Sequence, residues 1–251
     1  MPPRLLSLLL LACAWPLASG RAATRELDRS NQCVVVLAND WTSTTGVLQA
    51  FERAGAKASW KEHGPGLAVV LGKNGLGQGL GLVRLDFKHA PKKQEGDNRA
   101  PAGIFRLSYA FGYAPVYETI GIGIPYMPLT TQTEGIDDPK SRYYNRLVDR
   151  AGVVAVDWRS SEKMRRDDDL YKWGVVVEHN PAPIPGAGSC IFLHVWKNSS
   201  TATAGCTAMP ERDMERLIRW LDHSREPILV QMPRANYRAI RARYGLPPDR
   251  S

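Results

Sequence analysis

The sequence lacks the residue spacings that usually mark nucleotide and metal sites. Its glycine-rich segment GKNGLGQGLGLV matches neither the GxGxxG nor the Walker pattern, so we predict a loop or hairpin there rather than a phosphate cradle. The 5 histidines and 4 cysteines form no CxxC or HxxxH pair. A metal site built from His179, His194 and Cys206 is therefore a weak alternative, and we expect neither a metal nor another cofactor.

Long apolar runs are also scarce, and the main one lies at the N-terminus. The segment MPPRLLSLLLLACAWPLASG has an early Arg, then apolar residues, then small residues, which is the order of a secretory signal peptide. We predict a leader over residues 1–23, cleaved between Gly20 and Ala23, and a protein exported to the periplasm or the cell wall. A lipoprotein that begins at Cys13 is the alternative. The apolar run is too short to cross a bilayer and no later run is long enough, so we expect no stable membrane span.

Acidic residues are outnumbered by basic ones. The sequence has 25 Asp and Glu against 33 Lys and Arg, a formal charge of +8. Such a surplus favours an anionic partner, such as cell wall, nucleic acid or a lipid surface, and says little about the fold. Because the protein is expected to be exported, we expect no nucleic-acid partner. Residues 234–251, which include RANYRAIRARYG, are predicted to be a basic C-terminal tail with a solvated surface.

Cysteine is scarce and, without the leader, odd in number. Cys33, Cys190 and Cys206 remain, which leaves one thiol unpaired in an oxidising compartment. Cys33 and Cys190 begin the apolar runs CVVVLA and CIFLHVW, so both are expected on core strands and could pair with each other. Cys206 lies instead in a loop of small polar residues. It is either half of a disulfide or a functional thiol.

The apolar segments predict a mainly β fold with a few helices at its periphery. QCVVVLAND, LAVVLG, AGIFRL, WGVVVEHN, CIFLHVW and EPILVQM are predicted strands. We predict a short helix in residues 43–55, a charged short helix and loop in residues 157–173, and a clearer helix in residues 210–222, where Pro210 suits the first turn. The apolar stripe of this last helix is Met214, Leu217, Ile218 and Leu221. No repeat or linker interrupts the chain, so we expect one domain.

The stretch HVWKNSSTATAGCTAM brings together the parts of a cysteine acyl-transfer site. His194 ends an apolar strand, and a small-residue loop can fold Cys206 back beside it. Gly205 permits a tight turn, and the N–H groups of Gly205, Cys206 and Thr207 could receive an oxyanion. Cys206 also precedes Pro210 by four residues, and a nearby helix N-terminus would favour its thiolate. The alternatives are a disulfide cysteine and a structural histidine.

This stretch resembles the active-site signature of the L,D-transpeptidases, the family with the YkuD-type catalytic domain. In that family a His is followed by a loop and then by Ser/Thr–His–Gly–Cys. Other segments resemble an exported proteobacterial branch of the family, namely EGDNRAPAGIFRL, IDDPKSRYYNRLVD, DWRSSEKMRRDDDLYKWGVVVEHN and GAGSCIFLHVW. The resemblance runs from about residue 31 to residue 233. It implies a single β-sandwich-like catalytic domain over residues 31–233, between the leader and the basic tail.

The resemblance also implies roles for individual residues. Cys206 would be the nucleophile, His194 the general base and Gly205 the glycine of the motif. The sequence departs from the family at Ala204, where a second His is common. His179, at the end of a neighbouring strand, is a candidate to support the site in its place.

The implied reaction is a two-step acyl transfer on peptidoglycan stem peptides. Cys206 would attack the carbonyl of the third residue of a tetrapeptide, and the terminal D-Ala would leave. An amine would then resolve the thioester, forming a cross-link or exchanging the terminal D-amino acid. The alternatives are an L,D-carboxypeptidase on the same scaffold and a non-catalytic cell-wall-binding protein. Loop residues expected near the groove are Arg159, Arg165 and Arg166, as partners for stem carboxylates, and Tyr126, Asp137 and Asp138.

Overall fold

The computed structural model describes residues 26–249. The predicted leader, residues 1–23, lies outside the described residues. Within residues 26–249, no helix combines the length and the apolar character needed to cross a membrane.

The described residues fold mainly into β-strands. The strands are β1 (Gln32–Ala38), β2 (Thr45–Glu52), β3 (Lys61–Val70), β4 (Leu76–Gln78), β5 (Ala100–Gly112), β6 (Tyr126–Pro128), β7 (Thr133–Gly135), β8 (Leu147–Asp149), β9 (Glu162–Lys163), β10 (Trp173–Val177), β11 (Phe192–Val195), β12 (Thr207–Met209) and β13 (Ile228–Pro233). Residues 26–29 are helical, and the further helices are α2 (Glu211–Trp220) and α3 (Arg234–Ile240), with 3-10 turns η1 (Val116–Thr119), η2 (Arg150–Gly152) and η3 (His223–Arg225). The predicted mainly β fold is therefore confirmed.

The main sheet has ends that meet. Neighbouring strands follow the order β10-β11-β12-β3-β2-β1-β13-β5-β4, and β10 also pairs with β5. This extra antiparallel pairing, which sets Trp173 opposite Gly112, joins the path into a closed ring. Two pairs of neighbouring strands in the ring are parallel, namely β1 with β13 and β11 with β12. The second parallel pair sets the segments of His194 and Cys206 side by side.

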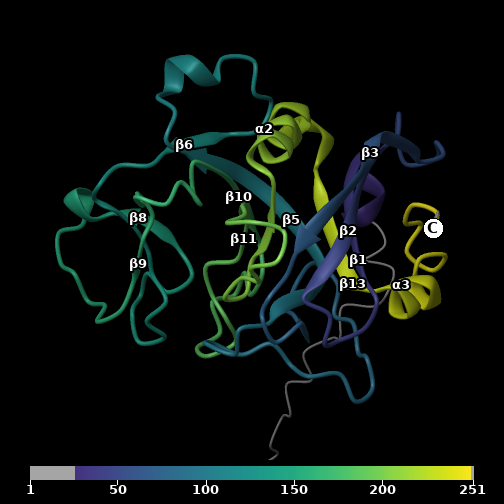
Figure 1. The fold of residues 1–251 in the computed structure, drawn as a ribbon, viewed down its shortest axis with the longest axis horizontal. Helices are drawn as coiled ribbons and strands as arrows, with labels where there is room; N and C mark the ends of the chain where they lie inside the picture. Colours follow the sequence, from purple (N-terminus) through teal and green to yellow (C-terminus); the bar gives the residue numbers. More distant parts are fainter. Residues whose placement is uncertain (1–25, 250–251) are drawn as a thin grey trace, which may run out of the picture.

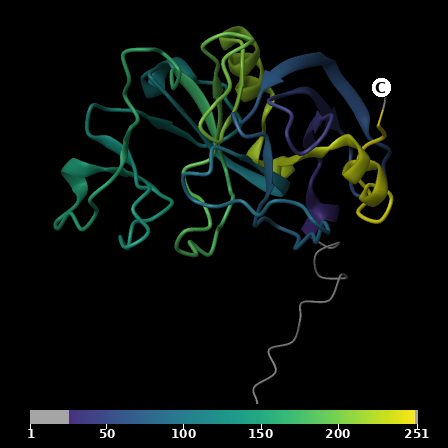
Figure 2. The ribbon, with the colours of Figure 1, turned by 60° about the horizontal axis from the view of Figure 1, so that its bottom comes forward.

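The helices and a small second sheet lie around the ring. Strand β7 lies between β8 and β9, and this sheet occupies the side of the molecule away from α3 (Figure 1). The turned view shows the same order, with the loops around the small sheet at one end and α3 at the other (Figure 2). Helix α2 packs over β10 and β11, and α3 contacts β13 and β1. Helix α2 begins directly after Pro210 and buries Met214, Leu217 and Ile218, as its apolar stripe predicts.

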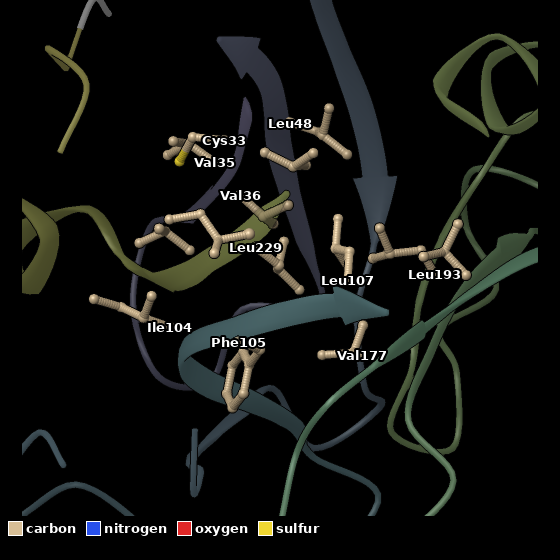
Figure 3. Packing of buried hydrophobic residues seen from close by; sticks show 14 of the residues in the cluster. Cys33, Val35, Val36, Leu48, Ile104, Phe105, Leu107, Val177, Leu193 and Leu229 are labelled. Atoms are coloured by element: carbon tan, nitrogen blue, oxygen red, sulfur yellow. The ribbon is translucent and has the colours of Figure 1, made fainter. Parts of the chain in front are cut away.

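Apolar side chains from many strands fill the interior of the ring. Strand β1 is buried along its whole length because it pairs on both sides, with β2 and β13. Figure 3 shows its residues Cys33, Val35 and Val36 among side chains of β2, β5 and β13. Burial of this apolar surface is the main favourable term in folding.

The three described cysteines are free thiols, so the disulfide considered between Cys33 and Cys190 is absent. Cys33 belongs to the main core, as its apolar run indicated. Cys190 lies just before β11, with a positive φ of 51°, and its thiol is directed to the carbonyl of Ile136 at 3.6 Å. It packs in the smaller apolar cluster that also contains Cys206.

The helix predicted in residues 43–55 is wrong, because this segment forms β2. Val47, Leu48 and Phe51 have helical spacing, but Val47 is 48% exposed while Leu48 and Phe51 are buried. The strand pairs antiparallel with β1 and with β3. Pairing beside a fully buried strand outweighs a weak helical pattern, particularly where threonine and valine favour extended backbone.

The short helix predicted in residues 157–173 is also absent from the described structure. The segment contains β9 and a series of turns. Asp168 accepts two hydrogen bonds from Arg166, at 2.8 and 2.6 Å, and another from the backbone N–H of Leu170. Such local side-chain hydrogen bonds compete with helix formation, and this explains why the charged segment forms turns instead of a helix.

Candidate active site

Cys206 and His194 lie on neighbouring parallel segments and face the same pocket. His194 is in β11 and pairs with Ala208 of β12. Because side chains alternate along a strand, Cys206 lies on the same face as Ala208. Both candidate residues line a pocket of about 560 Å³. The structure therefore brings together the two residues that the sequence analysis placed at the centre of the site.

The thiol of Cys206 is held between two backbone groups. Its Sγ accepts a hydrogen bond from the N–H of Phe192 at 3.3 Å and donates toward the carbonyl of Cys190 at 3.7 Å. Among the described residues, no hydrogen bond joins Sγ to His194. The resting thiol thus has a defined position in the pocket, and its proton points to backbone rather than to the imidazole.

Gly205 makes the turn into Cys206. Its φ of 152° disfavours other residues, and an added Cβ would lie 3.2 Å from the carbonyl oxygen of Arg99. The hydroxyl of Thr203 braces the same turn, accepting from Gly205 N–H at 3.1 Å and donating to the Cys206 carbonyl at 2.7 Å. The N–H of Gly205 is thus engaged within the turn.

Thr207 anchors the strand that follows the cysteine. Its hydroxyl donates to the Gln231 side chain at 2.6 Å, and Gln231 in turn donates to the carbonyl of Pro101 at 2.8 Å. Thr207 and Gln231 are both buried. This chain of bonds runs from β12 through β13 to β5 and fixes the position of the Cys206 backbone across the ring.

The imidazole of His194 has an assigned tautomer. Its Nδ1 lies 2.7 Å from the carbonyl oxygen of Val195, which can only accept, so Nδ1 carries the proton. Nε2 is then the acceptor of the neutral ring. Burial lowers the pKa of His194 to about 4, against the smaller opposing effects of hydrogen bonding to the backbone of Val195 and of Leu170. The ring is therefore neutral near pH 7 and able to accept a proton.

The thiol of Cys206 is also neutral at rest. Burial raises its pKa to about 12, and the negative charge of Glu162 adds to the increase. The helix expected beside it, α2, begins at Glu211, and β12 separates it from Cys206 along the chain. The free site thus holds a thiol and a neutral imidazole rather than a thiolate and an imidazolium. If Cys206 acts as a nucleophile, proton transfer from its thiol would have to accompany the attack.

One wall of the pocket is formed by Tyr171, Glu162 and Arg166. The sequence did not predict that these three side chains contact one another. The Tyr171 hydroxyl donates to Glu162 at 2.7 Å, and Arg166 lies 3.3 Å from the same carboxylate oxygen. The Tyr171 ring meets the His194 imidazole edge-on. Burial raises the pKa of Glu162. No local spacing in the segment DDDLYKW indicates this contact, which arises only through the tertiary fold.

His179 lies in a different pocket from Cys206, one of about 400 Å³. Its Nδ1 accepts from the N–H of Leu80 at 3.2 Å, and its Nε2 lies 2.8 Å from the carbonyl of Ala187. Both ring nitrogens are used in holding loops together. The structure does not bring His179 to the candidate nucleophile, and Ala204 itself lines the Cys206 pocket.

The loop residues expected near the groove divide into two groups. Arg166 and Asp137 line the Cys206 pocket. Arg165 stacks over the ring of Tyr113, 4.3 Å from its centroid. Arg165 and the remaining three, namely Tyr126, Asp138 and Arg159, lie outside the lining of this pocket. Arg166 is the one arginine of the three that reaches the pocket, and its guanidinium is paired with Asp168.

A comparison with protein families matches residues 42–230 to the L,D-transpeptidase catalytic domain, YkuD. No curated protein and no solved structure matches the chain. The matched segment begins before β2, ends within β13 and includes every residue that lines the Cys206 pocket. The match covers well over half of the chain, and the chain belongs to the family of L,D-transpeptidase catalytic domains.

Proposed function

We propose that this protein is an L,D-transpeptidase that acts on peptidoglycan stem peptides through a thioester on Cys206. The observation that carries the proposal is the placement of Cys206 and His194 on adjacent parallel segments, facing one pocket. Membership of the family supports transpeptidase chemistry and a cell-wall substrate. A cell-wall substrate in turn supports action outside the cytoplasm, in the periplasm or at the wall.

The first step is acylation of the cysteine. Nε2 of His194 takes the proton of the Cys206 thiol as Sγ attacks the carbonyl carbon of the third stem residue. The developing oxyanion is received by the backbone N–H of Cys206. The N–H of Gly205 is not used because it donates to Thr203, and Thr207 is paired with Leu193 in the β11–β12 ladder. The C–N bond to the terminal D-Ala then breaks, and the leaving amine takes the proton from His194.

The second step transfers the acyl group. The amine of a neighbouring stem, or of a free D-amino acid, attacks the thioester carbon and gives its proton to His194. The C–S bond breaks and the thiol is restored with the proton that His194 held. The products are a cross-link or an exchanged terminus. Water in place of the amine would give a tripeptide, which is the carboxypeptidase alternative.

The test is to incubate the purified protein with a disaccharide-tetrapeptide and to identify products and protein adducts by mass spectrometry. We expect an acyl adduct on Cys206 and cross-linked or exchanged products. Cys206→Ala should abolish both, and His194→Ala should slow adduct formation by at least about a hundredfold. Cys33→Ala is the control, because it removes another buried thiol that lies in the main core and outside the lining of the Cys206 pocket. This variant should retain activity.

Three results would contradict parts of the proposal. Tripeptide and free D-Ala without any amine product would identify a carboxypeptidase. Product that persists in Cys206→Ala would exclude Cys206 as the nucleophile. Absence of an adduct with any stem peptide would favour a non-catalytic wall-binding protein.

A further inference from the structure

We propose that Asp137 binds a primary ammonium group of the peptide ligand in the Cys206 pocket. The inference rests on the proposed function and gives one side chain a role in substrate specificity. Asp137 follows β7, in the small sheet beside the ring, and lines the pocket together with Cys206 and His194. An ammonium bound there would belong to the same ligand whose carbonyl reaches the thiol.

Asp137 differs from the other carboxylates of the pocket because no hydrogen bond or ion pair joins it to another described residue. Glu95 accepts hydrogen bonds from two hydroxyl groups, at 2.6 and 2.7 Å. Glu162 accepts from Tyr171 and is paired with Arg166. Oδ1 of Asp137 is shielded from solvent, yet no donor among the described residues reaches it. A carboxylate with one shielded oxygen that lacks a donor is unfavourable, and a cation held at the same carboxylate would offset its charge and part of that penalty.

The adjacent carboxylate, Asp138, already fixes the loop. Its Oδ1 accepts from the N–H of Lys140 at 2.9 Å, and its Oδ2 accepts from the N–H of Arg159 at 2.8 Å. Asp137 is therefore not required to form these turn contacts. Of two consecutive aspartates, one organises the backbone and the other is presented to the pocket.

The cations around the pocket do not neutralise Asp137. Lys93 is paired with Asp97 at 2.6 Å, Arg166 is paired with Asp168 at 2.6 Å, and among the described residues no ion pair joins Lys197, the third cation of the lining, to Asp137. Asp137 is close enough to Glu162 for its charge to raise the pKa of that carboxyl, although burial is the larger cause. The Asp137 side of the pocket is therefore acidic, which favours a cationic group on the ligand.

A stem peptide with a diamino acid at its third position carries such a group on its side chain. The ammonium can come from the donor peptide, whose third residue forms the thioester, or from the acceptor peptide, whose amine attacks it. Both sources share the chemistry of a primary ammonium beside Cys206. An acceptor held on Asp137 has to lose a proton before attack, and a carboxylate is a suitable group to take it.

The test compares two tetrapeptides that differ only at the third residue, lysine in one and norleucine in the other. Binding to the Cys206→Ala protein is measured by isothermal titration calorimetry, so that no turnover is needed. We expect the lysine peptide to bind about tenfold more tightly, as a charge-assisted hydrogen bond would give. Asp137→Asn in the same background should remove this preference and leave norleucine binding unchanged. The control is Asp167→Asn, which removes an exposed carboxylate outside the pocket and should keep the preference.

An unchanged preference in Asp137→Asn, or no preference in the parent protein, would overturn the assignment. The source of the ammonium is identified with the active protein. Its reaction rate is measured with lysine or norleucine at the third position, first of the donor peptide and then of the acceptor peptide. Loss of rate confined to a norleucine donor or to a norleucine acceptor identifies the peptide that Asp137 holds. If the active protein forms no thioester while the binding preference holds, the proposed function fails and the assignment of Asp137 stands.

Discussion

The ring of Tyr171 meets the imidazole of His194 edge-on, with the ring centroids 5.2 Å apart and the planes at 90°. The Tyr171 hydroxyl is at the same time bonded to Glu162 at 2.7 Å. His194 is also held at Nδ1 by the Val195 carbonyl. The imidazole is thus fixed both in its plane and in its tautomer, which suits a base that has to meet a thiol at a defined angle.

The contact predicts unequal effects of two substitutions at Tyr171. Tyr171→Leu removes the ring edge and the hydroxyl and should lower the acylation rate by about tenfold, because the imidazole loses its lateral support. Tyr171→Phe keeps the ring and should lower the rate by no more than about threefold. Release of D-Ala from the tetrapeptide measures the rate, below the unfolding temperature of each variant. Equal losses in the two variants would assign the effect to the hydroxyl instead.

Gly205→Ala should impair the turn that carries Cys206. The new Cβ would lie 3.2 Å from the Arg99 carbonyl oxygen at a φ that side chains disfavour. We expect a loss of about 1–3 kcal/mol in the free energy of unfolding and a strong loss of activity. Urea unfolding and D-Ala release measure the two effects. Gly55→Ala is the matched control, since nothing lies within 4 Å of its added Cβ. A Gly205→Ala variant as active as the control would contradict this account.

Thr207→Val should destabilise the protein by about 1–3 kcal/mol, since it leaves the buried Gln231 oxygen without its donor. Thr207→Ser retains the hydroxyl and should lose less. Thermal and urea unfolding of both variants give the comparison. If the valine variant were the more stable of the two, the Thr207–Gln231 bond would not be what holds β12 in place.

Stability should fall as the pH is lowered through the weakly acidic range. Burial lowers the pKa of His179 and of His194 to about 4, against about 6.5 for an unfolded histidine. The unfolded chain takes up protons first, so the stabilisation is complete above about pH 6.5 and is lost progressively as pH falls toward 4. At pH 5 the loss is about 2 kcal/mol for each histidine. Urea unfolding at pH 7.5, 6 and 5 measures it.

A variant separates the histidines from other titrating groups. His179→Gln removes one of the two buried imidazoles, so its loss of stability between pH 7.5 and 5 should be about half that of the parent protein. A free energy of unfolding that does not change over this range would show that neither imidazole is held neutral by burial.

The parts of the fold predicted correctly are those whose pattern is local. Helix α2 follows from Pro210 and its apolar stripe, and β1 follows from a continuous apolar run. Strand β2 could not be predicted from its local pattern. Its apolar residues have helical spacing, but the segment becomes a strand because it pairs with β1 and β3. The charged segment after residue 157 is held in turns by side-chain hydrogen bonds, such as that of Arg166 to Asp168. The spacing of apolar residues in the sequence does not predict such bonds.

The site shows the same division. Cys206 and His194 were accessible from the sequence because a short motif contains both. Tyr171 and Glu162 were not, because they reach the pocket from turns and from a strand of the small sheet. The neutral state of Cys206 was also not foreseen, because it depends on burial and on the charge of Glu162. Asp137 was expected near the groove, but its lack of a partner becomes visible only in three dimensions.

The closure of the ring depends on one of the last segments of the chain. Strand β13 lies between β1 and β5, so the ring stays open until residues 228–233 have been synthesised and inserted. Until then β1 has an unpaired edge at Cys33, the residue that pairs with Ile228. Pairings between segments so far apart in the sequence are slow to form. Before this insertion the edge of β1 at Cys33 is open to an oxidant, whereas afterwards the Cys33 thiol is fully buried.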